Sequence, residues 1–271
     1  METDNNVTKA NVPAGEKRFT KRAAIGAAAV ISALYAGMLL AQNIEGNTVN
    51  DSFSKAKRML ERSVYFDHRV TLYCRAPFDE KKNIKLPEGF KTPKHEKRAV
   101  RVEWEHVVPA ENFGRFFVEW REGADVCVDN KGRSFKGRKC AEKANETFRY
   151  MQADMYNLFP AIGAVNALRS NYNFTMLSGV PNTFGTCEMK IDGRRAEPPE
   201  YARGEIARAT LYMAAAYPQY RISSQQRKLM ESWNKLYPAT EWECERADRI
   251  RALQKNENPY VVEACRAARL R

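Results

Sequence analysis

Residues 101–110, RVEWEHVVPA, place an imidazole and two carboxylates at the end of one predicted strand. The side chains at 100, 102 and 104 are apolar and those at 101 and 103 are charged, an alternation that predicts a β-strand over residues 100–106. Pro109 disfavours helix at Val108 and ends the strand. Strict alternation puts His106 on the apolar face and Glu105 on the other. The two side chains therefore reach one site only if the strand ends or twists around them.

A second stretch, MYNLFPAIGAVN at residues 155–166, supplies the other half of the predicted site. Pro160 favours the first position of a helix, where its missing N–H costs nothing. Asn166 and Arg169 are three residues apart and would share one face of that helix.

The chain has 271 residues, with 45 Lys and Arg against 33 Asp and Glu, a net charge of +12. Residues 1–44 hold five basic and three acidic residues, so 40 basic and 30 acidic residues remain in 45–271. The positive charge thus belongs to the body of the protein. Such a body attracts nucleic acid, anionic lipid or acidic polysaccharide, and charge alone does not choose among them.

The six cysteines include no C-x-x-C pair, which argues against a structural zinc site. Their even, scattered distribution favours three disulfides in an oxidising compartment over six buried thiols in a cytosolic enzyme. We expect one bond within a basic loop, one near the C-terminus and a third by elimination. These pairs are Cys127–Cys140, Cys244–Cys265 and Cys74–Cys187.

The N-terminus predicts export. Residues 1–22 form a polar leader, expected to be disordered, that ends in four basic residues among positions 17–22. Residues 23–41 are free of charge and close to the length of a membrane-spanning helix. An uncleaved signal-anchor and a cleaved signal peptide both fit this run, although no good small-x-small cleavage pattern follows it. A linker over 42–50 would then lead into a folded domain over 51–271.

That domain is predicted to be a single α+β unit, mixed and predominantly helical. Ser52 caps a helix over residues 53–64, and residues 70–74 alternate like a strand. Residues 77–99 are charged and interrupted by Pro and Gly, which indicates an irregular loop, and residues 111–140 contain two Gly-rich, basic turns. Helices are predicted over 205–216, after a serine cap at 223 or 224, and after Thr240, where Thr240 and Glu243 form a capping box. No internal repeat is present.

His106 is the best candidate for a catalytic base among the three histidines, because carboxylates surround it and a strand end presents it. The chain has no nucleophile elbow, phosphate-binding glycine loop, dinucleotide-binding fingerprint or H-E-x-x-H motif. One base, nearby carboxylates and a basic body predict a metal-assisted hydrolase of a polyanion. The alternative is that Glu105 and His106 form only a strand-end ion pair or a satisfied core histidine.

The sequence resembles the bacterial endonuclease I family, periplasmic or secreted nonspecific nucleases with a ββα-metal active site. The likeness runs from about residue 52 to 265 and begins with EWEHVVPA at 103–110. Further matching stretches are NLFPAIGAVN at 157–166, RSN at 169–171, GTCEM at 185–189, ARGEIAR at 202–208, WNK at 233–235 and EWEC at 241–244.

The resemblance implies a role for each matching position. His106 is expected to be the general base, Glu105 and Asn166 metal ligands, and Arg138 the group that neutralises the cleaved phosphate. Less certain members of the surrounding shell are Glu103, Gln152, Asn157 and Arg169, with Asn157 more typical of a structural turn. The expected cofactor is one Mg²⁺, or another hard cation such as Mn²⁺ or Ca²⁺, per active site.

The expected substrate is DNA, and also RNA, bound through phosphates with little sequence specificity by a monomer. Hydrolysis would leave 5′-phosphate ends. The sequence departs from the family at Gln152, where the family often has Glu, and at Ala167 and Leu168, where it has Gly-Asp. Residues 115–137 also differ from the usual loop, and the family usually has more cysteines. These departures keep a second hypothesis open, a catalytically weak or inactive nucleic-acid-binding or uptake protein on the same fold.

Overall fold

The computed structural model describes residue 1 and residues 45–270. The predicted leader and the apolar run over 23–41 lie outside the described residues. Among residues 45–270, no helix is long and apolar enough to cross a membrane.

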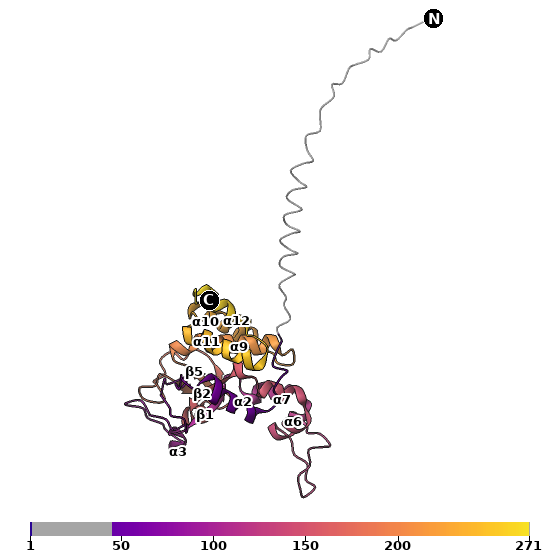
Figure 1. The fold of residues 1–271 in the computed structure, drawn as a ribbon. Coiled ribbons are helices and arrows are strands. Elements are labelled where there is room, and N and C mark those ends of the chain that lie inside the picture. The colour runs from indigo at the N-terminus through magenta and orange to yellow at the C-terminus, as the bar shows by residue number, and fades with distance from the viewer. Residues whose placement is uncertain (2–44, 271) are drawn as a thin grey trace. The chain divides into compact units, whose positions relative to one another are not determined.

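A pair of antiparallel strands forms the centre of the described fold (Figure 1). β1 (Val102–His106) pairs with β2 (Leu158–Ile162), with Trp104 opposite Pro160. Helix α8 (Gly163–Arg169) follows β2 without a connecting loop and packs against both strands. The strand predicted over residues 100–106 is therefore confirmed, and its partner is the second stretch singled out in the sequence.

Pro160 does not start a helix, so that prediction is wrong. It lies in the middle of β2, and the helix begins three residues later at Gly163. The carbonyl of Pro160 accepts a hydrogen bond from the Leu72 N–H at 2.8 Å, so its backbone faces away from β1. The missing N–H of proline therefore removes no bond from the β1–β2 ladder. The local propensity of Pro160 favours the start of a helix, but pairing with β1 makes this segment a strand.

The strand predicted over residues 70–74 is also wrong. This segment forms turns and contributes one isolated bridge, between Val70 and Pro77. Apart from the Leu72 N–H, which bonds the Pro160 carbonyl, its bonds to other backbone groups are local, such as that from the Arg75 N–H to the Thr71 carbonyl.

The remaining elements surround the central pair. A second, three-stranded sheet has the order β3-β5-β4, with β3 parallel and β4 antiparallel to β5. Its strands are β3 (Asn173–Phe174), β4 (Lys190–Asp192) and β5 (Arg195–Glu197). The helices before β2 are α2 (Phe53–Met59), the π-helix η1 (Leu60–Val64), α3 (Glu96–Ala99), α4 (Ala110–Gly114), α5 (Val118–Arg121), α6 (Arg138–Ala144), α7 (Glu146–Gln152) and the 3₁₀ turn η2 (Met155–Asn157). Those after β5 are the 3₁₀ turn η3 (Glu200–Ala202), α9 (Arg203–Ala216), α10 (Ser224–Leu236), α11 (Glu241–Gln254) and α12 (Pro259–Ala267).

The four C-terminal helices gather on one side of the central strands, as Figure 1 shows for α9 to α12. Three predicted N-caps are confirmed: the side chains of Ser52, Ser223 and Thr240 each accept a backbone N–H of the first helical turn. The capping box of Thr240 is only half formed. The carboxylate of Glu243 turns away to pair with buried Arg208, with Oε1 accepting from Nε at 2.6 Å.

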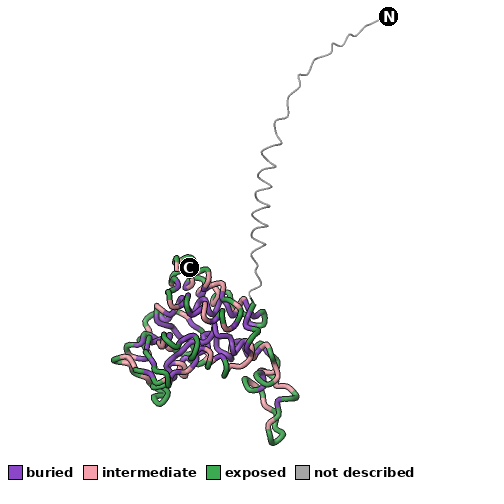
Figure 2. The backbone as a smooth tube through the Cα atoms, viewed as in Figure 1, coloured by how far each residue is buried: buried purple, intermediate pink, exposed green. Residues whose placement is uncertain are grey.

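Two clusters of buried apolar side chains meet at the central strands, and β1 contributes Trp104 to one and Val102 to the other. Figure 2 shows buried backbone running through the middle of the domain and exposed backbone at the projecting loops. The three predicted disulfides are confirmed as Cys74–Cys187, Cys127–Cys140 and Cys244–Cys265. The described part of the chain is thus a mixed α/β domain with three cross-links.

The segment before α2 is bonded to the body of this domain. Asn47, in the predicted linker, is 1% exposed, and its N–H contacts the Tyr217 hydroxyl at 2.8 Å. The same N–H lies 3.3 Å from the buried carboxylate of Asp154, which also accepts hydrogen bonds from the hydroxyls of Tyr212 and Tyr217. The folded domain therefore begins ahead of Asp51.

Candidate active site

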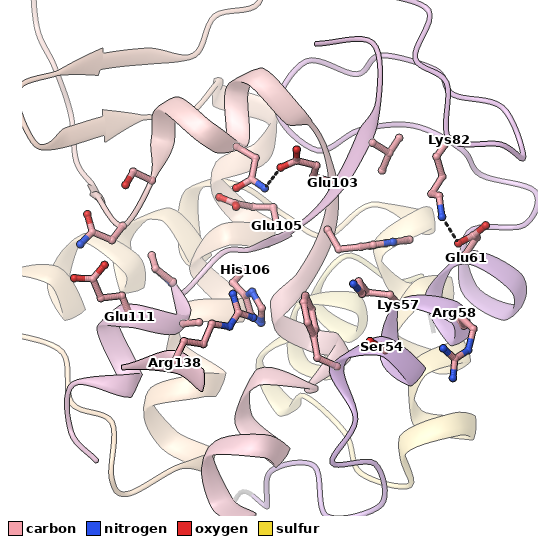
Figure 3. Close-up of a pocket in the computed structure, with 18 of the residues that line it drawn as sticks. Ser54, Lys57, Arg58, Glu61, Lys82, Glu103, Glu105, His106, Glu111 and Arg138 are labelled. Atoms are coloured by element: carbon pink, nitrogen blue, oxygen red, sulfur yellow. Dashed lines mark hydrogen bonds and ion pairs between the residues drawn. The ribbon is translucent and has the colours of Figure 1, made fainter. Parts of the chain in front are cut away.

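One groove of about 740 Å³, which we call the central groove, collects most of the residues selected from the sequence (Figure 3). Glu105 and His106 lie in its middle, with Lys57 and Arg58 on one side and Glu111 on the other. Its ionisable lining residues are Lys57, Arg58, Glu61, Lys82, Glu103, Glu105, His106, Glu111 and Arg138. Ser54, Asn166, Ser170 and Asn171 are further polar residues of the wall.

His106 is held in one tautomer by the backbone. Its Nε2 lies 2.9 Å from the carbonyl oxygen of Gln152, which can only accept, so Nε2 carries the hydrogen and Nδ1 keeps its lone pair. The ring packs against Phe53, with centroids 4.9 Å apart, and its side chain lines the groove. Burial, together with the charge of Arg138, lowers the pKa of His106 to about 3. The imidazole is therefore neutral throughout the physiological pH range.

Glu105 is a buried carboxylate with one occupied and one open oxygen. Its Oε1 accepts hydrogen bonds from the Tyr73 hydroxyl at 2.9 Å and from Nη1 of Arg169 at 2.8 Å. No residue in 45–270 donates a hydrogen bond to Oε2, although the side chain lines the groove. Burial raises the pKa of Glu105, and Arg169 and Tyr73 act in the opposite direction.

Asn166 is oriented by Glu103. Its Nδ2 donates to Oε2 of Glu103 at 2.9 Å, which leaves its amide oxygen without a partner in the described chain. Glu103 is itself fixed by Arg98, whose Nε donates to Oε1 at 2.7 Å. A side chain at Gly163 would meet the Arg98 carbonyl and the Glu103 carboxylate at 2.6 and 2.8 Å, so the close approach of α8 to α3 and β1 requires glycine there.

Arg138 is the first residue of α6 and extends into the groove beside His106 (Figure 3). Its Nε and Nη2 both donate to Oε1 of Gln152, each at 3.2 Å. Within residues 45–270 it has no carboxylate partner. Gln152 is fully buried, and its Nε2 is one of the few buried polar atoms of the described chain without a hydrogen-bond partner. One residue thus contacts His106 through its backbone and Arg138 through its side chain.

Arg169 and Asn157 do not line the central groove. Arg169 is 1% exposed and donates to Glu105 and to the carbonyl of His106, the latter at 2.7 Å. Asn157 is fully buried, and its side chain bonds both the N–H and the carbonyl of Val108, at 2.7 and 2.9 Å. These two side chains fix the backbone at the end of β1. That end is what brings Glu105 and His106 to the same groove.

Sequence reasoning missed three contributors to the site, of which Phe53 and Lys57 line the groove and Tyr73 lies behind it. Tyr73 bonds Glu105 from a turn that is held by the adjacent Cys74–Cys187 disulfide. Phe53 packs on His106, and Lys57, one helical turn further along α2, lies 4.5 Å from the Phe53 ring centroid. The apolar spacing of the first helix identified Phe53 as a buried-face residue, but nothing local indicated what it would cover.

The open oxygens of Glu105 and Asn166 form the donor set that could hold a cation. A carboxylate oxygen and an amide oxygen suit a hard ion that retains waters in its other positions. Within the described residues, no group of three or more His, Cys, Asp or Glu side chains is arranged to hold a metal. The donor set therefore fits an open Mg²⁺-type site and does not fit a closed structural one.

The groove combines a neutral imidazole, a buried carboxylate and cations without acidic partners. This combination is typical of a phosphoester hydrolase that binds a polyanion. Residues 67–265 match the model of the family described as Endonuclease I. The chain is 43% identical over 221 residues to an extracellular deoxyribonuclease of Aeromonas hydrophila, covering 79% of the chain and 90% of that relative. It is 44% identical over 209 residues to a periplasmic deoxyribonuclease of the same species, covering 74% and 82%. It is 37% identical over 221 residues to the endonuclease-1 of Buchnera aphidicola subsp. Acyrthosiphon pisum, covering 79% and 82%.

The chain belongs to the endonuclease I family. The family resemblance stated from its sequence is confirmed.

Proposed function

We propose that the protein is a metal-dependent endonuclease that hydrolyses phosphodiester bonds of DNA, and also of RNA, with little sequence specificity. The observation that carries this proposal is the state of His106. Its Nε2–H is tied to the Gln152 carbonyl, and its neutral Nδ1 is left to act in the groove that Glu105, Asn166 and Arg138 share. The deoxyribonuclease names of the relatives support the same reading.

In this proposal β1, β2 and α8 form the ββα-metal core. Glu105 on β1 and Asn166 on α8 would hold the metal, with Glu103 orienting the Asn166 amide. A bound Mg²⁺ supplies positive charge to the phosphate oxygens and to the leaving oxygen. The rest of the chemistry belongs to side chains of the chain itself.

His106 would accept through Nδ1 a proton from water as its oxygen attacks phosphorus. The P–O bond to the 3′ oxygen breaks, and that oxygen takes up a proton from a solvent water to become a 3′-hydroxyl, so the other product keeps a 5′-phosphate. Arg138 would hold the phosphate oxygens beside His106, since among the described residues its guanidinium has only the neutral Gln152 as a hydrogen-bond partner. Lys57 and Arg58 line the same groove and would bind neighbouring phosphates.

Two properties of the substrate follow from this arrangement. Attack by external water does not need a 2′-hydroxyl, so both DNA and RNA qualify. Contacts from lysine and arginine to phosphates carry no base information, so cleavage is expected at many sequences.

We further infer that the protein works outside the cytoplasm as a monomer. The extracellular and periplasmic relatives and the three disulfides support export. The apolar run over 23–41 would either anchor the chain in the inner membrane or be removed with a signal peptide.

Plasmid nicking by the full-length chain, with its disulfides formed, tests the proposal. We expect cleavage with Mg²⁺, none with EDTA, and loss of cleavage in His106→Ala with Mg²⁺ present. His95→Asn is the matched control, because His95 is exposed and lies outside the groove. The products should accept ligation without prior phosphorylation, as 5′-phosphate ends do.

The alternative function is a nucleic-acid-binding or uptake protein with weak or no catalysis. The neutral Gln152 at a position where the family often has Glu is the feature that favours it. Tight, salt-sensitive DNA binding without nicking, in Mg²⁺ and in Mn²⁺, would establish this alternative and overturn the enzyme proposal.

A further inference from the structure

A second groove, which we call the arginine groove, lies beside the central groove and has a volume of about 610 Å³. It is formed by α4, the turn after α8, the turn before β5 and the start of α10. Its lining residues are Asn112, Arg115, Phe116, Asn171, Tyr172, Asn173, Arg194, Arg195, Tyr220, Arg221, Ile222, Ser223 and Gln226. Four of these described residues are arginines and none is acidic, so the groove has an uncompensated positive charge.

The four arginines fall into two pairs. Arg115 and Arg195 each form an ion pair at the edge of the groove, with Glu111 and Asp192 respectively. Arg194 and Arg221 are exposed, and neither has a hydrogen bond or ion pair with any described residue. An exposed guanidinium without a protein partner is free to bind a phosphate in a bidentate manner.

An aromatic side chain completes the groove. Phe116 is 46% exposed, although it is large and apolar, and its ring meets the buried Tyr220 edge to face with centroids 6.0 Å apart. Tyr220 therefore supports Phe116 from below and leaves part of its ring open to solvent. Arginines interleaved with an exposed aromatic ring form the type of surface that binds an unpaired nucleic-acid strand, with phosphates on the cations and a base on the ring.

The two grooves are adjacent and share part of their wall. Asn171 lines both of them, and Glu111 of the central groove is followed in α4 by Asn112 of the arginine groove. The side chain of Asn112 donates a hydrogen bond of 2.9 Å to the side chain of Asn173, which links α4 to the start of β3. The junction lies on the Glu111 side of the central groove, opposite Lys57 and Arg58 (Figure 3). A nucleic-acid strand that enters beside Lys57 and passes His106 would therefore continue into the arginine groove.

We propose that the arginine groove binds the nucleotides that flank the cleaved bond when the substrate strand is unpaired. Arg194 and Arg221 bind two of its phosphates, and Phe116 stacks on one of its bases. This inference rests on the proposed function, because it takes the central groove as the place of cleavage. It adds a preference for single-stranded or gapped substrates over intact duplex.

The test compares the full-length chain with Arg194→Glu/Arg221→Glu on two substrates that differ in length. A long single-stranded oligonucleotide reaches both grooves, whereas thymidine 5′-(p-nitrophenyl phosphate), with one diester bond, reaches only the central groove. We expect KM for the oligonucleotide to rise about tenfold or more with kcat unchanged, since two phosphate contacts are replaced by repulsion. The rate with the small diester should stay as in the wild type, which also verifies folding.

Two further measurements make the assignment specific. The slope of log KM against log salt concentration should fall by about 1.4, because each phosphate contact to a single strand contributes about 0.7. Phe116→Ala should raise KM roughly tenfold for the single strand but leave KM for intact duplex unchanged. Lys235→Glu/Arg266→Glu is the matched control, since both residues are exposed, lack a partner in the described chain and lie outside both grooves.

An equal loss of rate on both substrates, or a rise in KM no larger than that of the control, would overturn the proposal. Failure of the proposed function looks different, because the wild type would then cleave neither substrate. Binding of the oligonucleotide in EDTA, measured by fluorescence anisotropy, still decides about the arginine groove in that case. Weaker binding by Arg194→Glu/Arg221→Glu than by the control supports the groove, and equal binding rejects it.

Discussion

The central groove and the arginine groove carry equal numbers of Lys and Arg side chains but differ in what accompanies them. Four carboxylates line the central groove, at positions 61, 103, 105 and 111, and none of the described residues lining the arginine groove is acidic. Carboxylates fix the directions of neighbouring cations and supply oxygen ligands, which chemistry at a phosphate needs. A groove with cations alone attracts the same polyanion without acting on it.

Arg169 and Arg194 show the same contrast between an arginine with a carboxylate partner and one without. Arg169 is 1% exposed and donates to Glu105 and to the backbone of β1, so it belongs to the framework of the site. Arg194 is exposed and has no partner in the described chain. The same side chain is therefore expected to govern stability in one place and substrate binding in the other.

The largest expected effect separates these two arginines. Arg169→Met leaves the carboxylate of Glu105 buried without its cation, which should lower the free energy of unfolding by about 3–5 kcal/mol. Arg194→Met should change it by no more than about 0.5 kcal/mol, as is usual for exposed side chains. Urea unfolding with the disulfides intact measures both. Comparable losses in the two variants would contradict the assignment of Arg169 to the framework.

Glu105→Gln should separate catalysis from binding. The amide keeps the shape of the side chain and can still accept from Tyr73 and Arg169, but it loses the charge that would hold Mg²⁺. We expect kcat to fall by roughly 10³-fold on both the long and the small substrate, since a metal contributes several kcal/mol to such a transition state. Oligonucleotide binding in EDTA should stay unchanged, because the arginine groove is intact. Retention of kcat within tenfold would remove Glu105 from the set of metal ligands.

Local sequence signals were sufficient for the parts of the fold that depend on near neighbours. The caps at Ser52, Ser223 and Thr240, the long C-terminal helices and the strand at 102–106 follow from short-range patterns. Pairing with a distant segment decided the rest. Residues 158–162 became a strand because β1 pairs with them, against the helix-starting tendency of Pro160. Residues 70–74 alternate like a strand but form turns, and only the Leu72 N–H among them bonds the distant β2.

The sequence predicted the reactive side chains of the candidate site, but it did not predict the residues that hold those side chains in place. The composition of residues 101–110 identified His106 and Glu105, and the family resemblance added Asn166 and Arg138. The groups that hold them come from elsewhere in the chain: Tyr73 is 32 residues from Glu105, and the Gln152 carbonyl is 46 residues from His106. Every residue has a backbone carbonyl, so the sequence does not indicate which one bonds His106. The tautomer of His106 could be assigned only from the structure.

A smaller effect is expected at Glu103, which orients the Asn166 side chain in the central groove. Glu103→Ala removes the acceptor that orients the Asn166 amide, so that the amide can present its N–H to the metal position. We expect a 10- to 100-fold loss in metal affinity or kcat, the usual range for such supporting residues. Titration of the small-diester rate with Mg²⁺ separates these two effects. Glu103→Gln should restore most of the activity, because its amide oxygen still accepts from Asn166, and a purely structural role would not predict that rescue.

The smallest effect concerns Gln152, one of the positions at which the sequence is expected to depart from the family pattern. Gln152→Glu replaces the unpartnered Nε2 with a second carboxylate oxygen and places a negative charge beside Arg138 and His106. That charge strengthens the attraction for a cation in the central groove, so the Mg²⁺ concentration for half-maximal cleavage of the small diester should fall several-fold. Gln152→Met is the matched comparison, because it removes the amide without adding charge and should not lower the Mg²⁺ requirement. If both variants leave that requirement unchanged, the side chain at 152 acts on Arg138 alone, and the difference between this chain and its family lies in phosphate binding.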